Sequence, residues 1–305
     1  MGHGEWRERN EAPHTPVMLQ EVLEWLRIRP EGIYIDATLG AGGHSEAIAE
    51  RLSTGRLISL DRDAQALQIA QERLKRLGSR VSCVLSPFSR IAEAARELGI
   101  PTVDGVLADL GVSSMQLDNA ERGFSFREAG PLSMRMGISA ESPQSELTAD
   151  EIVNRWSEKE LADLLYREAD EHDSRRIARA VVRARPIRDT AHLATVVAGS
   201  RKQWGRQRLH PATKTFLALR IAVNREMEEL GQFLSRVPAT MNPGGRCVIL
   251  TYHSGEDRMV KEAFREAERQ GELKVLTKHV VRPSEEEERA NPRSRSAKLR
   301  CAERA

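Results

Sequence analysis

The sequence predicts an α/β fold in which a doubly wound parallel sheet is interrupted by an inserted helical subdomain. Between residues 33 and 109, short runs rich in β-branched residues alternate with segments of helical periodicity. The alternation then stops for about a hundred residues, and a β-rich run returns at 245–250. A length of 305 residues suits two structural units, or one large domain that carries an insertion.

The elements follow in order along the chain. Strands are expected at 33–35, 56–60, 81–85 and 103–107, with helices between them at 44–52, 64–77 and 91–98. Further helices are expected at 150–166, 174–185 and 213–234. A strand at 245–250 and a helix at 256–269 complete the sheet domain. We therefore predict a discontinuous sheet domain, 1–112 and 211–305, and an inserted helical domain, 113–210.

The net charge of +2 hides an uneven distribution of charged residues. Thirteen Lys and Arg lie between Arg175 and Arg225 against the single acid Asp189, and six lie between Arg289 and Arg304 against Glu303. Two basic zones in a nearly neutral protein predict a polyanionic partner such as nucleic acid, and solvated helix faces are the alternative. The second zone is expected to form a basic tail outside the sheet.

Other classes of protein are disfavoured by the composition. The apolar runs are far shorter than the roughly 18 residues of a membrane span, so no membrane partner is expected. The first fifteen residues lack the apolar stretch of a secretory signal, which makes the cytoplasm the expected location. The cysteines Cys83, Cys247 and Cys301 lie far apart, and no His/Asp cluster has metal-ligand spacing. Neither a disulfide framework nor a bound metal is expected.

A glycine-rich turn follows the first strand, at Asp36-Ala-Thr-Leu-Gly40-Ala-Gly42-Gly43-His44. Open α/β sheets bind ligands at the carboxyl ends of their strands, and glycines let the backbone approach the ligand closely. Asp61 ends the second strand, twenty-one residues after Gly40, where a carboxylate can accept both hydroxyls of a ribose. A purely structural turn and a surface aspartate are the alternatives.

Two further candidates follow the third and fourth strands. Phe88 offers a ring that could cover an adenine, although a place in the core is an equal alternative. Asp109, at the end of a central strand, is well placed for chemistry, with a capping role as the alternative. Two chemistries share this architecture, hydride transfer from NAD and methyl transfer from S-adenosylmethionine, and the departure of the turn from G-x-G-x-x-G weakens the NAD alternative.

Six motifs occur in one order along nearly the whole chain: His14-Thr-Pro-Val-Met, Tyr34-Ile-Asp-Ala-Thr-Leu-Gly-Ala-Gly-Gly-His-Ser, Asp109-Leu-Gly-Val-Ser-Ser-Met-Gln-Leu-Asp, Glu121-Arg-Gly-Phe-Ser-Phe, His210-Pro-Ala-Thr-Lys-Thr-Phe and Asn291-Pro-Arg-Ser-Arg-Ser-Ala-Lys-Leu-Arg. Together they resemble the MraW/RsmH family of bacterial 16S ribosomal RNA methyltransferases, which methylate the N4 of a cytosine in the decoding region. Six motifs in register make the resemblance highly specific.

The resemblance implies a Rossmann-like, class I S-adenosylmethionine-dependent methyltransferase sheet with an inserted substrate-recognition domain. It also implies the cofactor S-adenosyl-L-methionine and, as partner, the 16S rRNA of the small ribosomal subunit. Carried over by motif, the cofactor contacts would be Gly42, Gly43, His44, Asp61, Phe88, Asp109 and Gln116. Whether the chain forms a homodimer is left open.

Methyl transfer from a sulfonium needs an in-line approach of the nucleophile. The N4 amine is a poor nucleophile, so we expect an acceptor for its hydrogens: the catalytic candidate Asp109, or a backbone carbonyl in 110–112. His253 either lines the base pocket or is a hydrogen-bonded structural histidine, the favoured alternative.

The chain departs from the usual family pattern at Ser133 and Gly137, where two acids are usual, and at Arg167 and Gly255. Two other functions therefore stay open. One is an amino-methyltransferase acting on DNA or another RNA, and the other is a non-catalytic RNA-binding factor of ribosome assembly.

Overall fold

The computed structural model describes residues 16–137, 147–200 and 210–305. It divides into two compact units. The first comprises the chain up to Asp61, Ala66–Leu110 and Leu234–Ala305, and the second comprises Arg62–Gln65 and Gly111–Phe233. The insertion thus ends later than the predicted residue 210. The reason is that Phe216 and Leu219, which follow that boundary, are buried in the core of the helical unit.

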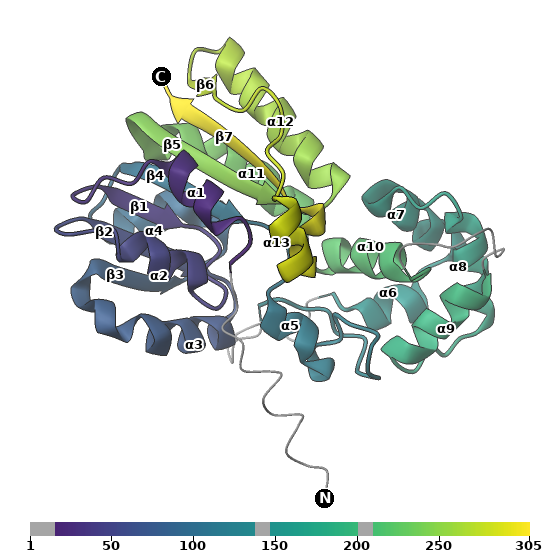
Figure 1. Cartoon of the computed structure of the whole chain (residues 1–305). Helices are drawn as coiled ribbons and strands as arrows, with labels where there is room; N and C mark the ends of the chain where they lie inside the picture. Colours follow the sequence, from purple (N-terminus) through teal and green to yellow (C-terminus); the bar gives the residue numbers. More distant parts are fainter. Residues whose placement is uncertain (1–15, 138–146, 201–209) are drawn as a thin grey trace, which may run out of the picture. The chain divides into compact units, whose positions relative to one another are not determined.

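The first unit is built on a seven-stranded sheet of order β3-β2-β1-β4-β5-β7-β6 (Figure 1). Its strands are β1 (Ile33–Asp36), β2 (Arg56–Asp61), β3 (Val81–Leu85), β4 (Val103–Asp109), β5 (Met241–Thr251), β6 (Leu273–Val275) and β7 (Lys298–Arg304). The first five are mutually parallel, and β7 is antiparallel to both its neighbours. The direction of winding reverses between β1 and β4, so this Rossmann-like sheet has its switch point there.

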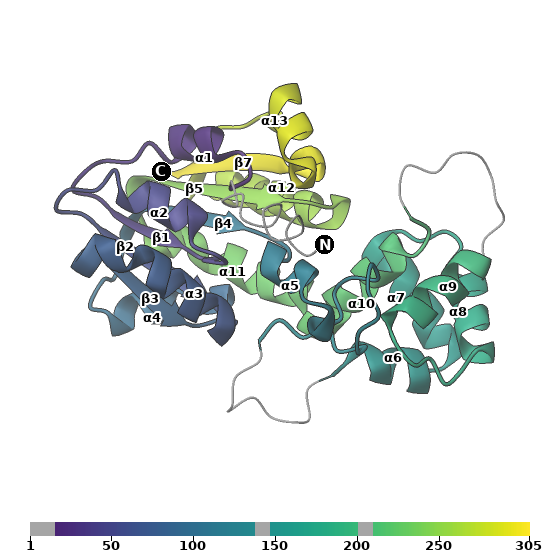
Figure 2. The same ribbon diagram turned by 60° about the horizontal axis from the view of Figure 1, so that its bottom comes forward.

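Helices cover both faces of this sheet, as right-handed crossovers require. Figures 1 and 2 show α1 (Leu19–Leu26), α2 (Gly43–Ala49) and α3 (Ala64–Leu74) on one face, and α4 (Ile91–Glu97) and α11 (Glu226–Thr240) on the other. Helix α12 (Ser254–Arg269) packs against β5, β6 and β7, and α13 (Glu285–Ala290) precedes β7. Short 3-10 segments lie at η1 (Lys75–Arg80), which is kinked at Gly78, at η2 (Phe88–Arg90) and at η4 (Pro292–Ser296).

The central strands are apolar because both of their faces are covered. Tyr34 shows how tightly they pack: it is 1% exposed, and a Cβ added to Gly105 on β4 would lie 2.8 Å from its ring. Its hydroxyl accepts a hydrogen bond from the Arg29 amide at 2.7 Å, so the buried oxygen is satisfied. Gly105 is therefore fixed by the ring on the adjacent strand.

The predicted basic tail was wrong. Residues 298–304 form β7, which pairs with β5 inside the sheet and with the edge strand β6. Arg300 is only 8% exposed, and its Nε donates to Asp257 Oδ1 at 2.7 Å, so a buried cation is paired. The alternation of charged and apolar residues in this segment is that of a β-strand, and Asp257 on α12 is the ionic partner of Arg300.

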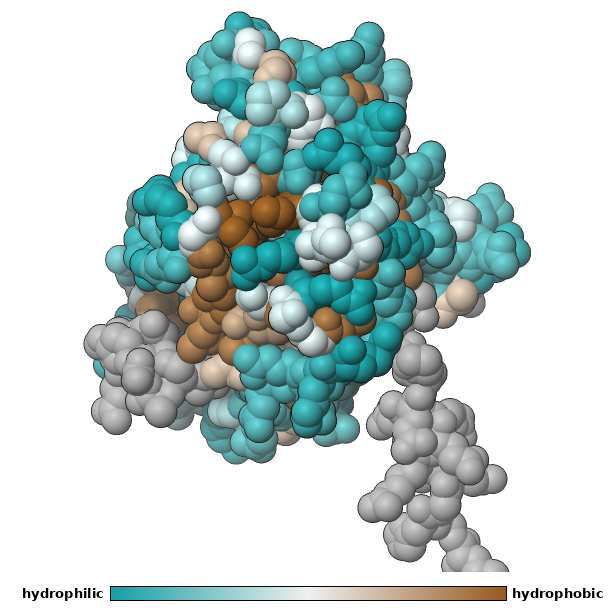
Figure 3. Space-filling model, turned by 90° about the vertical axis from the view of Figure 1, so that its left-hand side faces the viewer, coloured by the Kyte–Doolittle hydropathy of each residue, from teal (hydrophilic) through white to brown (hydrophobic). Residues whose placement is uncertain are grey.

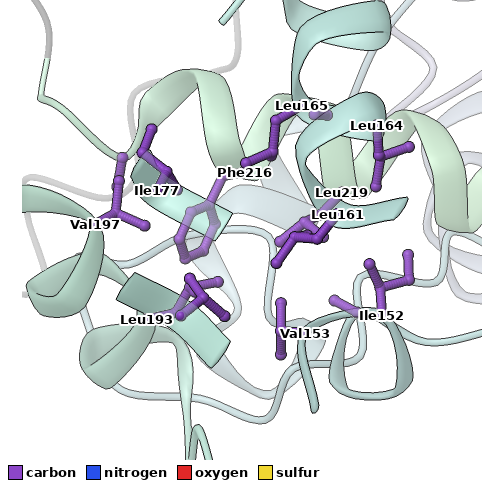
Figure 4. Close-up of a cluster of buried hydrophobic side chains, with 14 of the residues drawn as sticks. Ile152, Val153, Leu161, Leu164, Leu165, Ile177, Leu193, Val197, Phe216 and Leu219 are labelled. Carbon is purple, nitrogen blue, oxygen red and sulfur yellow. The ribbon is translucent and has the colours of Figure 1, made fainter. Parts of the chain in front are cut away.

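The second unit is all helical among its described residues. It contains α5 (Ser114–Asp118), η3 (Ala120–Arg122), α6 (Ala149–Arg155), α7 (Glu158–Ala169), α8 (Ser174–Arg183), α9 (Thr190–Ser200) and α10 (Thr213–Asn224). Figure 4 shows its apolar core, where side chains from α6 to α10 converge, among them Ile152, Leu161, Ile177, Leu193 and Phe216. The core gives the insertion its own source of stability.

Two long predicted helices are each broken in the structure. The expected helix 150–166 becomes α6 and α7, because Ser157 caps a new helix and forms a capping box with Glu160. The expected helix 213–234 becomes α10 and α11, because Arg225 adopts a left-handed conformation with φ of 51°. Neither break carries a glycine or proline, and the apolar periodicity continues across both.

Among the described residues, no helix is long and apolar enough to cross a membrane. Figure 3 shows one face of the molecule, mostly hydrophilic, with hydrophobic side chains gathered near its middle. The large hydrophobic side chains that are exposed in the described part are Ile69, Leu85 and Tyr166, at 45%, 49% and 57%. They are scattered over β3, α3 and α7, an ordinary distribution for a folded domain.

Candidate active site

The glycine turn after β1 is held by both neighbouring strands. The Ala37 amide donates to Leu107 on β4, and the Leu39 amide donates to Leu60 on β2, both at 2.8 Å. Gly40 and Gly42 have φ of 51° and 82°, a region that residues with a Cβ rarely adopt. The turn therefore needs glycine at both positions to connect β1 to α2.

Gly43 is glycine for a different reason. A Cβ added to it would lie 2.6 Å from the Cγ of Pro16, so the segment that precedes α1 packs directly on the turn. His44, the next residue, donates through Nε2 to the carbonyl of Val17 at 3.0 Å. The structure thus places Pro16 and Val17 against two of the predicted cofactor residues.

Asp61 and the glycine turn are brought together as their spacing suggested. The Gly40 amide donates to Asp61 Oδ2 at 2.8 Å across the ends of β1 and β2. A carboxylate offers about four acceptor sites, so this contact fits a residue that also receives hydroxyl donors. The bond orients the Asp61 carboxylate beside the turn.

A second carboxylate, Asp36, is buried beneath the turn at 1% exposure. It accepts the Ser45 hydroxyl at 2.6 Å and the Thr38 amide at 3.1 Å. Burial raises the pKa of Asp36, and these hydrogen bonds act against that rise. Its contacts are all to the turn and to the first turn of α2, so Asp36 supports the site from below.

Asp109 lies at the end of β4, next to the switch point of the sheet. Its amide donates to Thr38 Oγ1 at 2.6 Å, which joins the end of β4 to the glycine turn. Its side chain is 24% exposed, and Oδ1 accepts the Tyr252 hydroxyl at 2.6 Å. The pKa of Asp109 is raised to about 7: burial raises it most, the Tyr252 hydrogen bond lowers it, and the charge of Glu256 raises it. Such a group is poised to gain or lose a proton near neutral pH.

His44 faces the other oxygen of Asp109. Its Nδ1 lies 3.7 Å from Asp109 Oδ2. Burial lowers the pKa of His44, so the ring is neutral at neutral pH. Because Val17 offers a carbonyl to Nε2, the proton sits on Nε2 and Nδ1 is an acceptor. An acceptor nitrogen and a carboxylate oxygen therefore lie close together.

Tyr252 and Glu256 are the residues that sequence reasoning missed. Tyr252 follows β5, and burial raises the pKa of its phenol well above the ordinary value. The buried Glu256 accepts the amides of Tyr252 and His253 at 2.8 and 3.2 Å, which fixes the turn from β5 into α12. The S/T-x-x-E pattern of a capping box is absent here, because histidine occupies the cap.

Two roles were predicted for His253, lining the base pocket or being a hydrogen-bonded structural histidine, and its contacts are those of the structural role. Its Nδ1 accepts the amides of Gly255 and Glu256 at 3.2 and 3.4 Å and so caps α12. The ring is largely buried at the first turn of the helix, where its Nε2 lies 3.2 Å from Glu256 Oε1. The cap holds the end of β5, and with it Tyr252, in position.

Two of the remaining predicted residues, Phe88 and Gln116, belong to other elements. Phe88 opens η2 after β3 and is partly buried. Gln116 belongs to the helical unit, where it forms a capping box with Ser113 at the start of α5. Its side-chain Nε2 donates to Asp63 Oδ2 at 3.0 Å. His14, the first residue of the N-terminal motif, lies outside the described residues, as do Arg201, Lys202, Arg206 and Arg208 of the first basic zone.

Within the described ranges, no group of three or more His, Cys, Asp or Glu side chains is arranged to hold a metal ion. The site contains a glycine turn and two carboxylates, Asp61 at the end of β2 and Asp109 at the end of β4. It also contains Tyr252, whose hydroxyl donates to Asp109. This set suits a ligand with hydroxyl and amine groups.

The chain is similar to known proteins over nearly its whole length. The model of the MraW methylase family matches residues 11–305. The chain is 49% identical to ribosomal RNA small subunit methyltransferase H of Solibacter usitatus, over 95% of this chain and 99% of that protein. It is 48% identical to the protein of the same name from Koribacter versatilis, over 95% and 94%. A solved rRNA methylase from Streptococcus thermophilus is similar at 13% identity and a TM-score of 0.43, over 94% of this chain and 93% of that one. A match over nearly the whole length shows that the chain belongs to the MraW methylase family.

Proposed function

We propose that this protein transfers a methyl group from S-adenosylmethionine to the N4 of a cytosine in the decoding region of 16S rRNA. Membership of the MraW methylase family supports the reaction class, and the name of the relatives supports the small-subunit rRNA as substrate. The observation that carries the proposal is Asp109, a carboxylate with a pKa of about 7 at the switch point of the sheet, hydrogen-bonded to Tyr252.

The residues of the site fit the proposed cofactor. Asp61, oriented by the Gly40 amide, suits the two hydroxyls of a ribose, and the Phe88 ring after β3 suits a purine face. The anionic groups Asp36 and Asp109 suit a cationic ligand. When bound, S-adenosylmethionine supplies a methyl group on a sulfonium as the electrophile.

The protein's contribution at N4 is to accept hydrogen bonds. The exocyclic amine of cytosine carries two hydrogens, and its lone pair is delocalised into the ring. Asp109 Oδ2 and the His44 Nδ1 acceptor lie 3.7 Å apart, and a carboxylate that accepts an N4 hydrogen makes the nitrogen more electron-rich. When the N4–C bond forms, that hydrogen leaves as a proton, and Asp109 is the group whose pKa suits it to receive one.

Tyr252 has a positioning role in this scheme. Its hydroxyl occupies Asp109 Oδ1, so Oδ2 is the oxygen left to accept a hydrogen of the target amine. It also moderates the pKa of Asp109 and keeps the carboxylate ionised in part of the population at neutral pH. The target base must leave its stack to reach such a site, which suits a flipped or single-stranded nucleotide.

The test is incubation with methyl-labelled S-adenosylmethionine and, in separate reactions, small ribosomal subunits, naked 16S rRNA and DNA, followed by nucleoside analysis. We expect N4-methylcytidine from the subunits or the rRNA. Label in DNA alone would favour the second enzymatic function. RNA binding without label in any substrate, by a protein that still binds the cofactor, would favour an assembly factor.

A further inference from the structure

A cavity of about 250 Å³ lies in the sheet unit, away from the glycine turn, between α12, β6 and β7. Four cations line it, Lys261, Arg265, Lys278 and Arg300, against the single acid Glu268. Glu268 Oε1 accepts the Val275 amide at 2.9 Å, which orients this carboxylate and leaves four cations facing one negative charge. The cavity therefore has a strongly positive lining.

The buried member of this set is Arg300, at 8% exposure. Asp257 holds it through Nε at 2.7 Å. Its two terminal nitrogens make no hydrogen bond to any residue that the structure describes, and neither is fully enclosed by protein. A guanidinium that is fixed by one carboxylate and keeps its fork of donors at a cavity wall is the group proteins use to bind phosphate.

Unlike Arg300, the other three cations have no carboxylate partner among the described residues. Lys261, Arg265 and Lys278 make neither an ion pair nor a hydrogen bond with the described parts of the chain through their side chains. Arg76 is an example of a surface cation that has an ionic partner, with Glu46 at 3.0 Å. Like charges gathered around one cavity repel one another unless an anion joins them. The lining thus points to an anionic ligand.

The position of the cavity relates it to the candidate active site. Helix α12 begins at Ser254, two residues after Tyr252, and carries Lys261 and Arg265 further along the same helix. At 1.5 Å per residue these lie about 10 and 16 Å from its first turn. A polyanion bound at the site and running along α12 would bring its next phosphates to the cavity.

We infer that this cavity is a phosphate subsite for the backbone of the RNA substrate. The inference rests on the proposed function for the identity of the polymer. It differs from the predicted basic tail, because the ligand-facing charges come from α12 and the loop after β6, while Arg300 of β7 supplies a fixed donor at the wall.

The test replaces Lys261, Arg265 and Lys278 by Gln in one variant and leaves Arg300 unchanged, because Arg300 is part of the sheet. The matched control replaces Arg56, Arg96 and Lys274 by Gln: these residues also lie in the sheet unit, make no side-chain hydrogen bond or ion pair within the described ranges and do not line the cavity. Binding of a fluorescent single-stranded RNA is measured by anisotropy over a series of KCl concentrations. Methylation of small subunits is measured in parallel.

If three phosphate contacts are lost, the slope of log affinity against log salt should become shallower by about 2, at about 0.7 for each contact. The control should keep the parental slope, and KM for subunits should rise in the cavity variant while kcat changes little. A parental slope in the cavity variant, with methylation intact, would overturn the subsite and leave the proposed function standing.

Three other outcomes also decide the matter. If the cavity variant loses binding to intact subunits but keeps its affinity for naked RNA, the cavity binds a protein and the subsite is wrong. If calorimetry shows that inorganic phosphate binds the parent and not the variant, while RNA binding is equal in both, the ligand is free phosphate. If the parent neither binds nor methylates RNA, the proposed function fails and the RNA subsite fails with it.

Discussion

The Tyr252 hydroxyl donates a 2.6 Å hydrogen bond to Oδ1 of Asp109, across 143 residues of sequence. The bond joins the carboxyl ends of two adjacent parallel strands, β4 and β5. It opposes the burial that raises the Asp109 pKa to about 7. Of the causes that set the pKa of the proposed acceptor, the Tyr252 hydrogen bond is the one that lowers it.

Replacing Tyr252 by Phe should raise the pKa of Asp109 further. A lost hydrogen bond to a charged group corresponds to about one to two pH units. Since the ionised carboxylate is the proposed acceptor, methylation by the parent should rise with pH through about 7, and the variant should need a higher pH. The midpoint of the pH–rate profile measures this. Tyr34→Phe is the control, because that phenol accepts from Arg29 and lies away from the site. Coincident profiles for Tyr252→Phe and the parent would contradict the coupling.

Replacing Asp109 by Asn should stabilise the folded protein above neutral pH. Since the pKa of Asp109 is raised on folding, the native state holds a proton that the unfolded state has lost between about pH 4 and 7. Ionised Asp109 thus costs stability that grows with pH over this window and is absent at lower pH. Urea unfolding should show a gain of about 2 to 4 kcal/mol at pH 8 that disappears near pH 3. A gain of equal size at both pH values would point to packing instead of charge.

Replacing Asp61 by Ala should weaken cofactor binding. Loss of charge-assisted hydrogen bonds to a ribose costs about 1.5 to 3 kcal/mol, which is roughly tenfold to a hundredfold in Kd. The Gly40 amide also loses its acceptor in this variant. Calorimetry with S-adenosylmethionine and its demethylated product measures the effect, and circular dichroism confirms the fold. Parental affinity in a folded variant would defeat the assignment.

Replacing Arg300 by Gln should destabilise the sheet, which a basic tail would not do. Burial raises the pKa of Asp257, but the hydrogen bond and charge of Arg300 outweigh it and hold that pKa below its ordinary value. The pair thus contributes stability above about pH 4 that is lost as the pH falls through the lowered pKa. We expect a loss of about 1.5 to 3 kcal/mol at pH 7 in urea unfolding. Arg295→Gln, on exposed η4, should leave the unfolding curve unchanged.

Local patterns predicted the first four strands to within two residues, because buried parallel strands are short apolar runs between turns. The same patterns failed at β7. Arg300 and Lys298 suggested a solvated tail, and the partner that buries Arg300 is Asp257, on a helix 43 residues earlier. No window of sequence contains both members of that pair.

The candidate site shows the same division. Gly40 and Asp61 were predicted together, because strand and turn periodicity places both at the carboxyl edge of the sheet. Asp109 followed from the end of β4. Tyr252 was missed because no local motif marks it. Its hydrogen bond reaches Asp109, which lies 143 residues earlier in the sequence, before the insertion. The sequence thus identified Asp109, the proposed acceptor. Only the fold identified Tyr252, whose hydrogen bond lowers the pKa of Asp109.

Single-turnover methylation of small ribosomal subunits by the parent and by Asp109→Asn, with the methylated nucleoside identified, tests the central claim most directly. Asn keeps the shape of the side chain and removes its charge, so the rate should fall far more than the affinity for the cofactor. The account predicts N4-methylcytidine as the product of the parent and a rate reduced by about a hundredfold or more in the variant. A parental rate in Asp109→Asn, or a methyl group at any atom other than N4 of cytosine, would contradict it.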